Sequence, residues 1–143
     1  MLRTTLLLLS CSFALNFTSL QAQVVDNQLA EIQSGLEDEG YTQILATRYD
    51  WLDDDETGHH GLKLVAGRTY RIVGVCDQDC TDVDMFLYGD ETMESLLESD
   101  ELEDDVPVIE FTPSETKVYR IKIGMYDCSI EPCQVGIDVF RAN

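Results

Sequence analysis

Apolar and polar residues alternate in several short runs from residue 42 to the end of the chain. The clearest runs, residues 68–75, 118–126 and 135–140, have the period of two that is typical of a strand with one buried face. Weaker runs rich in β-branched or aromatic residues complete the pattern, at residues 42–51, 61–65, 83–88, 96–97 and 106–111. Polar turns separate them at intervals of roughly 8 to 14 residues. The pattern predicts an all-β fold, an antiparallel jelly-roll-like sandwich of about seven or eight strands.

A different period precedes the strands. Between residues 26 and 40, apolar residues recur at spacings of three and four, namely Leu29, Ile32 and Leu36. These spacings predict a short amphipathic helix, in which Asp26 caps the first turn and Gly40 ends the last. A mobile leader with helical tendency is the alternative, because Gly35 weakens a helix.

The first 22 residues have the character of an export signal. Arg3 provides a positive start, residues 6–17 are mostly apolar, and Ala22 is a small residue at the expected cleavage point. A lipoprotein-type cleavage box ending at Cys11 is the less favoured alternative. We therefore divide the chain into a signal peptide, a helical leader and a sandwich domain: 1–22, 23–40 and 41–143.

No later segment approaches the roughly 18 continuous apolar residues of a membrane span, so we expect a soluble, secreted or periplasmic protein without a membrane span.

Four cysteines remain after the expected cleavage, in two tight pairs: Cys76 with Cys80, and Cys128 with Cys133. An even number of cysteines in an exported protein indicates disulfides, because the compartment is oxidising. A four-cysteine zinc site is the competing interpretation, although zinc sites more often use closer pairs. Four cysteines allow three pairings. We expect the two local ones.

The chain is strongly acidic, with 28 Asp and Glu against nine Lys and Arg and a formal net charge of -19. Binding to phosphates requires clusters of Lys and Arg, so this composition argues against nucleic acid as a partner. The charge favours solubility, a cation, or a basic protein or extracellular polymer as the partner.

The strongest candidate for a metal site lies in and just beyond the first cysteine pair, where four aspartates gather: Asp77, Asp79, Asp82 and Asp84. Calcium takes about six to eight oxygen ligands, and a disulfide would constrain the loop that supplies them. The spacing is not that of an EF-hand, and a solvated acidic loop is the alternative. Two further acidic runs, residues 53–56 and 100–105, are expected to be solvated loops. Calcium is thus the candidate cofactor, and no cofactor is established by the sequence.

Other residues offer weaker chemistry. His59 and His60 are adjacent and are expected in an exposed loop, since neighbours on a strand point to opposite sides. Several aromatic residues, Tyr41, Tyr49, Trp51 and Tyr126, are expected in the core, with a carbohydrate-stacking face as the alternative. The serines lie in no recognisable nucleophile elbow.

Three segments resemble a known family. They are residues 64–72 (LVAGRTYRI), 81–88 (TDVDMFLY) and 118–123 (VYRIKI), and their order and spacing are similar to those of the bacterial pre-peptidase C-terminal domain. The match covers about residues 60–140. The family usually has a glycine before the late tyrosine, where this chain has Lys117 and Val118, and the cysteine pairs are additional. The resemblance implies a non-catalytic β-sandwich, and some relatives bind calcium or extracellular polymers.

We therefore expect a secreted, non-enzymatic binding or structural module, with calcium as a candidate stabilising ion. The alternatives are a small secreted hydrolase that uses acidic side chains, and an assembly subunit for a basic partner or matrix.

Overall fold

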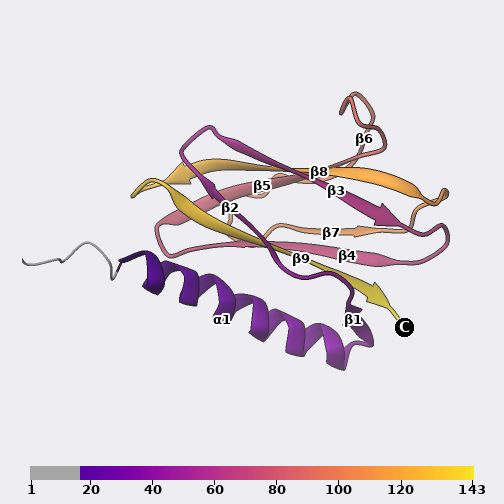
Figure 1. Ribbon diagram of the computed structural model, residues 1–143, viewed down its shortest axis with the longest axis horizontal. Helices are drawn as coiled ribbons and strands as arrows, with labels where there is room; N and C mark the ends of the chain where they lie inside the picture. The colour runs from indigo at the N-terminus through magenta and orange to yellow at the C-terminus, as the bar shows by residue number, and fades with distance from the viewer. Residues whose placement is uncertain (1–16) are drawn as a thin grey trace, which may run out of the picture.

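Two antiparallel sheets face each other, and one helix covers the outer side of one sheet (Figure 1). The structure is a computed structural model that describes residues 17–143. Most of the predicted export signal, including Cys11, therefore lies outside the described residues. The chain forms the antiparallel all-β sandwich with one N-terminal helix that the alternation predicted.

Within residues 17–143 the helix comes first and nine strands follow. The elements are α1 (Phe17–Asp38), β1 (Tyr41–Gln43), β2 (Arg48–Leu52), β3 (Thr57–Leu64), β4 (Tyr70–Cys76), β5 (Cys80–Tyr88), β6 (Leu96–Asp100), β7 (Val108–Phe111), β8 (Lys117–Cys128) and β9 (Cys133–Ala142).

Each sheet combines strands from distant parts of the chain. Sheet A has the order β1-β9-β4-β7, and β2 pairs with the same edge of β9 as β1 does. Sheet B has the order β3-β8-β5-β6. The long strands β8 and β9 are consecutive in the chain but lie in different sheets, so the turn between them crosses the sandwich.

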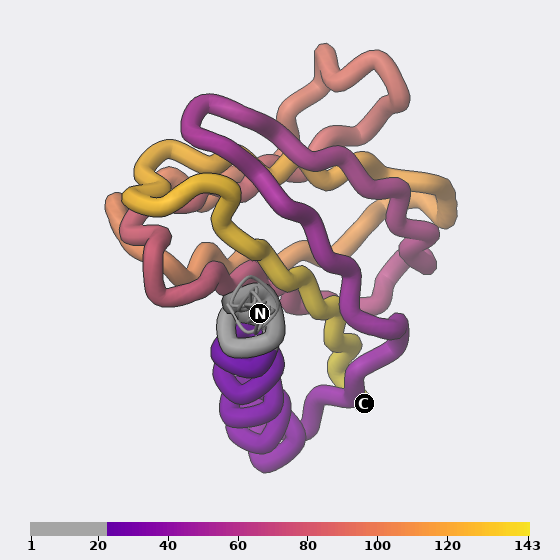
Figure 2. The backbone as a smooth tube through the Cα atoms, turned by 60° about the vertical axis from the view of Figure 1, so that its left-hand side comes forward, coloured from indigo at the N-terminus to yellow at the C-terminus, as the bar shows by residue number. Residues whose placement is uncertain are grey.

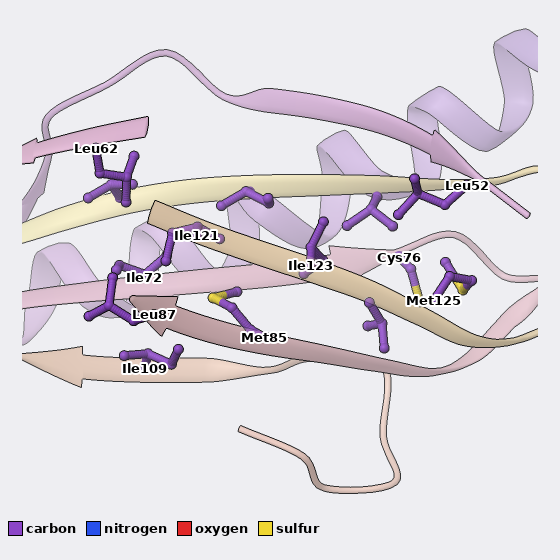
Figure 3. Close-up of a cluster of buried hydrophobic side chains, with 14 of the residues drawn as sticks. Leu52, Leu62, Ile72, Cys76, Met85, Leu87, Ile109, Ile121, Ile123 and Met125 are labelled. Atoms are coloured by element: carbon purple, nitrogen blue, oxygen red, sulfur yellow. The ribbon is translucent and has the colours of Figure 1, made fainter. Parts of the chain in front are cut away.

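The main core lies between the sheets. Its side chains come from alternate positions of the strands, for example Ile72 on β4, Leu87 on β5 and Ile121 on β8 (Figure 3). All three are fully buried. Burial of an aliphatic side chain of this size contributes about 1.5–3 kcal/mol, so this interface is the largest source of stability.

Helix α1 packs on the outer side of sheet A, as its position below the sheet in Figure 1 shows. Val25 and Leu29 contact Val75 on β4, while Leu36 contacts Phe140 on β9. The spacing of these helical residues places them on one face. In Figure 2 the C-terminus lies near the end of this helix, and the amide of Asn143 donates to the carbonyl of Gly40 at 3.0 Å.

Two expectations about the elements need correction. The helix begins at Phe17 and not at residue 26, so Asp26 lies within the helix and does not cap its first turn. The helix includes Ala22, and cleavage at that point stays a prediction. The expected histidine loop is part of β3, where His59 pairs with Lys122 and His60 with Ile121. By contrast, Gly40 follows the helix with a positive φ of 88°, as expected of a residue that ends a helix.

Candidate functional site

Two disulfides close the turns that cross between the sheets. Cys76 ends β4 in sheet A and bonds to Cys80, which begins β5 in sheet B. Cys128 ends β8 in sheet B and bonds to Cys133, which begins β9 in sheet A. Cys80 and Cys128 are also opposite each other in the β5-β8 ladder. The local pairing is therefore as predicted, and both bridges link the two sheets at the same end of the sandwich.

The disulfides also bear on the protein's environment. Disulfides persist in oxidising compartments and are rare in the cytosol. The pairing thus indicates an oxidising location outside the cytoplasm. Within the described part of the chain, no helix is long and apolar enough to cross a membrane.

Asp77, the first of the four predicted calcium ligands, points into the fold. Its side chain is 1% exposed. One carboxylate oxygen accepts the amide of Gln134 at 2.7 Å, and the other accepts the amide of Asp79 at 3.2 Å. The amide of Asp77 in turn donates to the carbonyl of Gln134 at 3.0 Å. Burial raises the pKa of the carboxyl group, and the two amide hydrogen bonds oppose the rise. Asp77 therefore joins the two disulfide-bonded turns to each other.

Asp79 also links the two turns, through its main chain. Its carbonyl oxygen accepts both the amide of Ser129 at 2.7 Å and the hydroxyl of Ser129 at 2.9 Å. Ser129 lies directly after Cys128 in the second turn. The Asp77–Asp79 segment thus serves the connection between the turns.

Asp82 and Asp84 lie on the outer side of β5. Their neighbours Val83 and Met85 are fully buried in the core, so the two aspartates point away from it. Asp82 is opposite Asp127 in the ladder with β8. One oxygen of Asp82, Oδ1, is buried and has no hydrogen-bond partner. The structure thus separates the four aspartates into two turn residues, of which Asp77 is buried, and an outward pair on the strand.

The second acidic run folds against the outward pair. The amide of Val83 donates to the carbonyl of Asp104 at 3.0 Å, which fixes this run beside β5. We call the resulting surface the acidic face, and define it as Asp82, Asp84, Asp100, Glu101, Glu103, Asp104 and Asp127. Asp82 and Asp84 were predicted as part of a candidate calcium site and residues 100–105 as a separate solvated loop, whereas Asp127 was not singled out. Their meeting was missed, because no local pattern reports how residues 100–105 return to β5.

Burial and mutual repulsion perturb the titration of the acidic face. The pKa of Asp84 is raised to about 6, mainly by burial and then by Asp82 and Glu101. The pKa of Asp82 is also raised, by burial first and then by the neighbouring carboxylates, beginning with Glu103. Lys122 lowers the pKa of Asp84 but does not cancel the rise. The surface therefore has a local excess of negative charge that a cation would relieve.

This crowding does not produce a metal cage. Among the residues that the structure describes, no group of three or more His, Cys, Asp or Glu side chains is arranged to hold a metal ion. Asp77 is engaged with main-chain amides, and Asp82 and Asp84 face outward. Calcium binding by these four residues stays a prediction from the sequence.

A histidine–carboxylate pair was not foreseen. His60 on β3 and Asp50 on β2 approach to 2.6 Å between Nε2 and Oδ2, and both side chains are mostly buried. A Cβ atom at Gly58 would lie 2.3 Å from the same Asp50 oxygen, so the absence of a side chain there makes room for the pair. Because β2 belongs to sheet A and β3 to sheet B, the pair is a second polar link between the sheets.

The expected burial of the aromatic residues is wrong in three cases. Tyr49, Trp51 and Tyr126 are 44%, 41% and 46% exposed. The first two belong to the short strand β2 at the edge of sheet A, whereas Tyr126 belongs to β8 near the acidic face. Their apolar surface is available for contacts with a partner.

No family model matches the chain, and no curated protein matches it. The first of the three segments that resemble the pre-peptidase C-terminal domain runs from the end of β3 through the turn into the start of β4, and the other two lie in β5 and in the first half of β8. That family assignment stays a prediction.

Proposed function

We propose that the protein is a secreted or periplasmic, non-enzymatic binding module whose acidic face binds a basic protein segment. The observation that carries the proposal is the Oδ1 atom of Asp82, a buried carboxylate oxygen without a hydrogen-bond partner, within a surface of like charge. A buried carboxylate oxygen without a donor is unfavourable, and an incoming Lys or Arg side chain would supply one.

The surroundings of Asp82 support a cationic side chain as the ligand. The pKa of Tyr126 beside the face is raised by burial and then by nearby carboxylates, beginning with Asp84. Tyr126 is also partly exposed, so its ring offers a surface over which a guanidinium or ammonium group can lie. The surface thus offers carboxylates for charge and an aromatic ring for contact area. Calcium is a separate prediction and is not required for this mode of binding.

The test uses a short oligolysine peptide and its fully acetylated form, titrated calorimetrically at low salt. The double variant Asp82→Asn/Asp84→Asn should lower affinity about tenfold or more, because two charges that face the peptide are removed. The matched control Glu31→Gln/Asp38→Asn removes the same net charge from exposed positions on α1. It should change affinity less than about twofold.

Three results would contradict the proposal. Equal losses in the two double variants would mean that the peptide responds only to the total charge of -19. Equal binding of the acetylated peptide would mean that the ammonium groups are not recognised. Tighter binding of an anionic or neutral extracellular polymer that depends on the same two aspartates would also assign the face to another class of partner.

A further inference from the structure

A pocket of about 250 Å³ lies between α1 and the β1-β2 edge of sheet A, on the other sheet from the acidic face. Three parts of the fold form it: the helix, the segment that runs from β1 to β2, and β9. The polar side chains that line it are Asp26, Gln33, Gln43, Thr47, Tyr49 and Asp138. Leu29 of the helix adds an apolar wall. We call this the α1 pocket.

Asp138 is the unusual residue of the α1 pocket. It is only 3% exposed and lies on the face of β9 that the helix covers. Thr47 and Gln43 hydrogen-bond to its carboxylate, but its Oδ1 atom is buried and has no partner. Burial is the main cause of a raised pKa at this carboxyl group. A buried carboxylate oxygen without a donor is rare in folded proteins, and it requires an explanation.

A second carboxylate lines the same pocket. The hydroxyl of Tyr49 donates to Oδ1 of Asp26 at 2.6 Å, and Thr47 hydrogen-bonds to Tyr49 as well as to Asp138. A continuous polar network therefore runs from the helix through β2 to β9. No Lys, Arg or His is among the residues that line the pocket, and the described α1 sequence contains none. The pocket thus has two acidic groups and no internal cation to balance them.

We propose that the α1 pocket binds a small aliphatic ammonium compound, with an ammonium group at Asp138. An ammonium group offers several donors and a positive charge, which together satisfy an unpaired carboxylate oxygen. Its alkyl part would lie against Leu29. The NH2 group of Gln33 donates to Glu37 at 2.8 Å, and Gln43 hydrogen-bonds to Asp138, so their side-chain carbonyl oxygens are the groups that could accept from a second ammonium group. The pocket volume suits a ligand of this small size.

Other ligand classes fit this pocket less well. An anion would be repelled by Asp26 and Asp138. A neutral sugar could occupy the space and use the amides, but it would leave the buried charge uncompensated. A metal ion needs a convergent set of ligands, and no such set occurs in the described part of the chain. A lysine side chain of another protein could also supply an ammonium group. The test below distinguishes it from a small ammonium compound.

The first measurement is calorimetric titration with 1,4-diaminobutane, compared with 1,4-butanediol, which has the same length but no charge. We expect a dissociation constant on the order of 0.1–1 mM for the diamine, since a ligand of this size has few atoms for contact. The diol should bind at least about tenfold more weakly. Equal binding of the two compounds would overturn the proposal.

Substitutions then locate the site. Asp138→Asn keeps the shape of the side chain and removes its charge, and it should weaken diamine binding by about tenfold or more. Asp26→Asn is an exposed change on α1 that should weaken binding severalfold without a risk to folding, so the test remains decisive if the first variant fails to fold. Glu31→Gln, on the same helix but outside the pocket, is the matched control and should bind normally. Unchanged affinity in both pocket variants would refute the assignment.

Two further arms separate the possible sources and sites. The first arm compares Nα-acetyl-lysine amide with the diamine. Tighter binding of the lysine derivative would mean that the pocket recognises a lysine of a partner protein, and it would overturn the small-molecule proposal. The Asp82→Asn/Asp84→Asn variant should bind the diamine as the unchanged protein does, because the acidic face belongs to the other sheet. Loss of diamine binding in that variant would contradict the assignment of the diamine to the α1 pocket, whatever the result of the oligolysine titration.

Discussion

Substitution of Asp77 distinguishes a structural carboxylate from a metal ligand. Asp77 is buried, and its two oxygens accept the main-chain amides of Gln134 and Asp79 at 2.7 and 3.2 Å. Alanine at this position removes both acceptors and leaves the amide of Gln134 without its short hydrogen bond. Asparagine retains one carbonyl oxygen, which can keep the bond to Gln134, and gives up the longer bond to Asp79. The two variants therefore remove different parts of one interaction.

The magnitudes follow from these contacts. A buried donor left unsatisfied costs about 1–3 kcal/mol, and a hydrogen bond to a charged acceptor contributes about 1.5–3 kcal/mol. Removal of the buried charge offsets part of this loss, because burial disfavours the ionised form of Asp77. We expect Asp77→Ala to lower the free energy of unfolding by about 2–3 kcal/mol, and Asp77→Asn by about 1 kcal/mol or less.

Urea unfolding at neutral pH, with both disulfides intact, measures these differences. Gln78→Ala, at an exposed position in the same turn, is the comparison and should change the free energy of unfolding by less than about 0.5 kcal/mol. The reasoning is refuted if alanine and asparagine at position 77 are equally destabilising, because the acceptor would then be unimportant. A loss that occurs only in the presence of calcium would identify Asp77 as a metal ligand.

Four further outcomes follow from the structure and the sequence. Asp84→Asn should raise the free energy of unfolding by about 1–2 kcal/mol at pH 7.5, after a discount for solvent, and the gain should vanish near pH 4. The reason is that the pKa of Asp84 is raised to about 6, so the unchanged protein recovers this stability as the pH falls from about 6 to 3.8. A difference in the free energy of unfolding between the two proteins that does not change with pH, measured by urea unfolding, would contradict this reasoning. Replacing Cys128 and Cys133 by alanine should lower stability by about 2 kcal/mol, measured in the same way, because the closed loop is short. Gly136→Ala should cost about 1–3 kcal/mol, since its Cβ would lie 2.6 Å from a methyl group of Val25 on the helix, and an unchanged urea midpoint would speak against tight packing there. The calcium prediction requires a higher Tm in about 5 mM calcium than in a chelator, and an unchanged Tm rejects it.

The alternating segments were predictable because each strand carries its own signal. Residues 118–126 alternate clearly and form the central part of β8. The first half of β3 lacks such a signal, since Gly58, His59 and His60 do not alternate between apolar and polar. It is a strand because eight consecutive residues pair with β8. Its pairing partner lies about 60 residues away, which a local pattern does not report.

The candidate site was only partly predictable for the same reason. The four aspartates near the first disulfide look alike in the sequence, yet Asp77 is distinguished by the amide of Gln134 on β9. Asp82 differs because Glu103 and Asp104, which follow β6 in the chain, lie near it and help to raise its pKa. The unpaired carboxylate of Asp138 was missed entirely, because Asp138 occupies a polar position in an alternating strand, and alternation predicts that such a position faces water. The helix that covers this face changes its environment.

Negative charge is disfavoured on the acidic face and in the α1 pocket for different physical reasons. The salt dependence of ligand binding should therefore distinguish the two sites. On the acidic face, several partly exposed carboxylates repel one another, and dissolved ions screen such repulsion within a Debye length of about 10 Å at 0.1 M. In the α1 pocket, the main disadvantage of the charge on Asp138 is burial, which salt relieves much less. Oligolysine binding at the acidic face should therefore weaken steeply with salt, whereas diamine binding that depends on Asp138 should weaken less. Two surfaces with the same charge would then be distinguished by the depth at which the carboxylate lies.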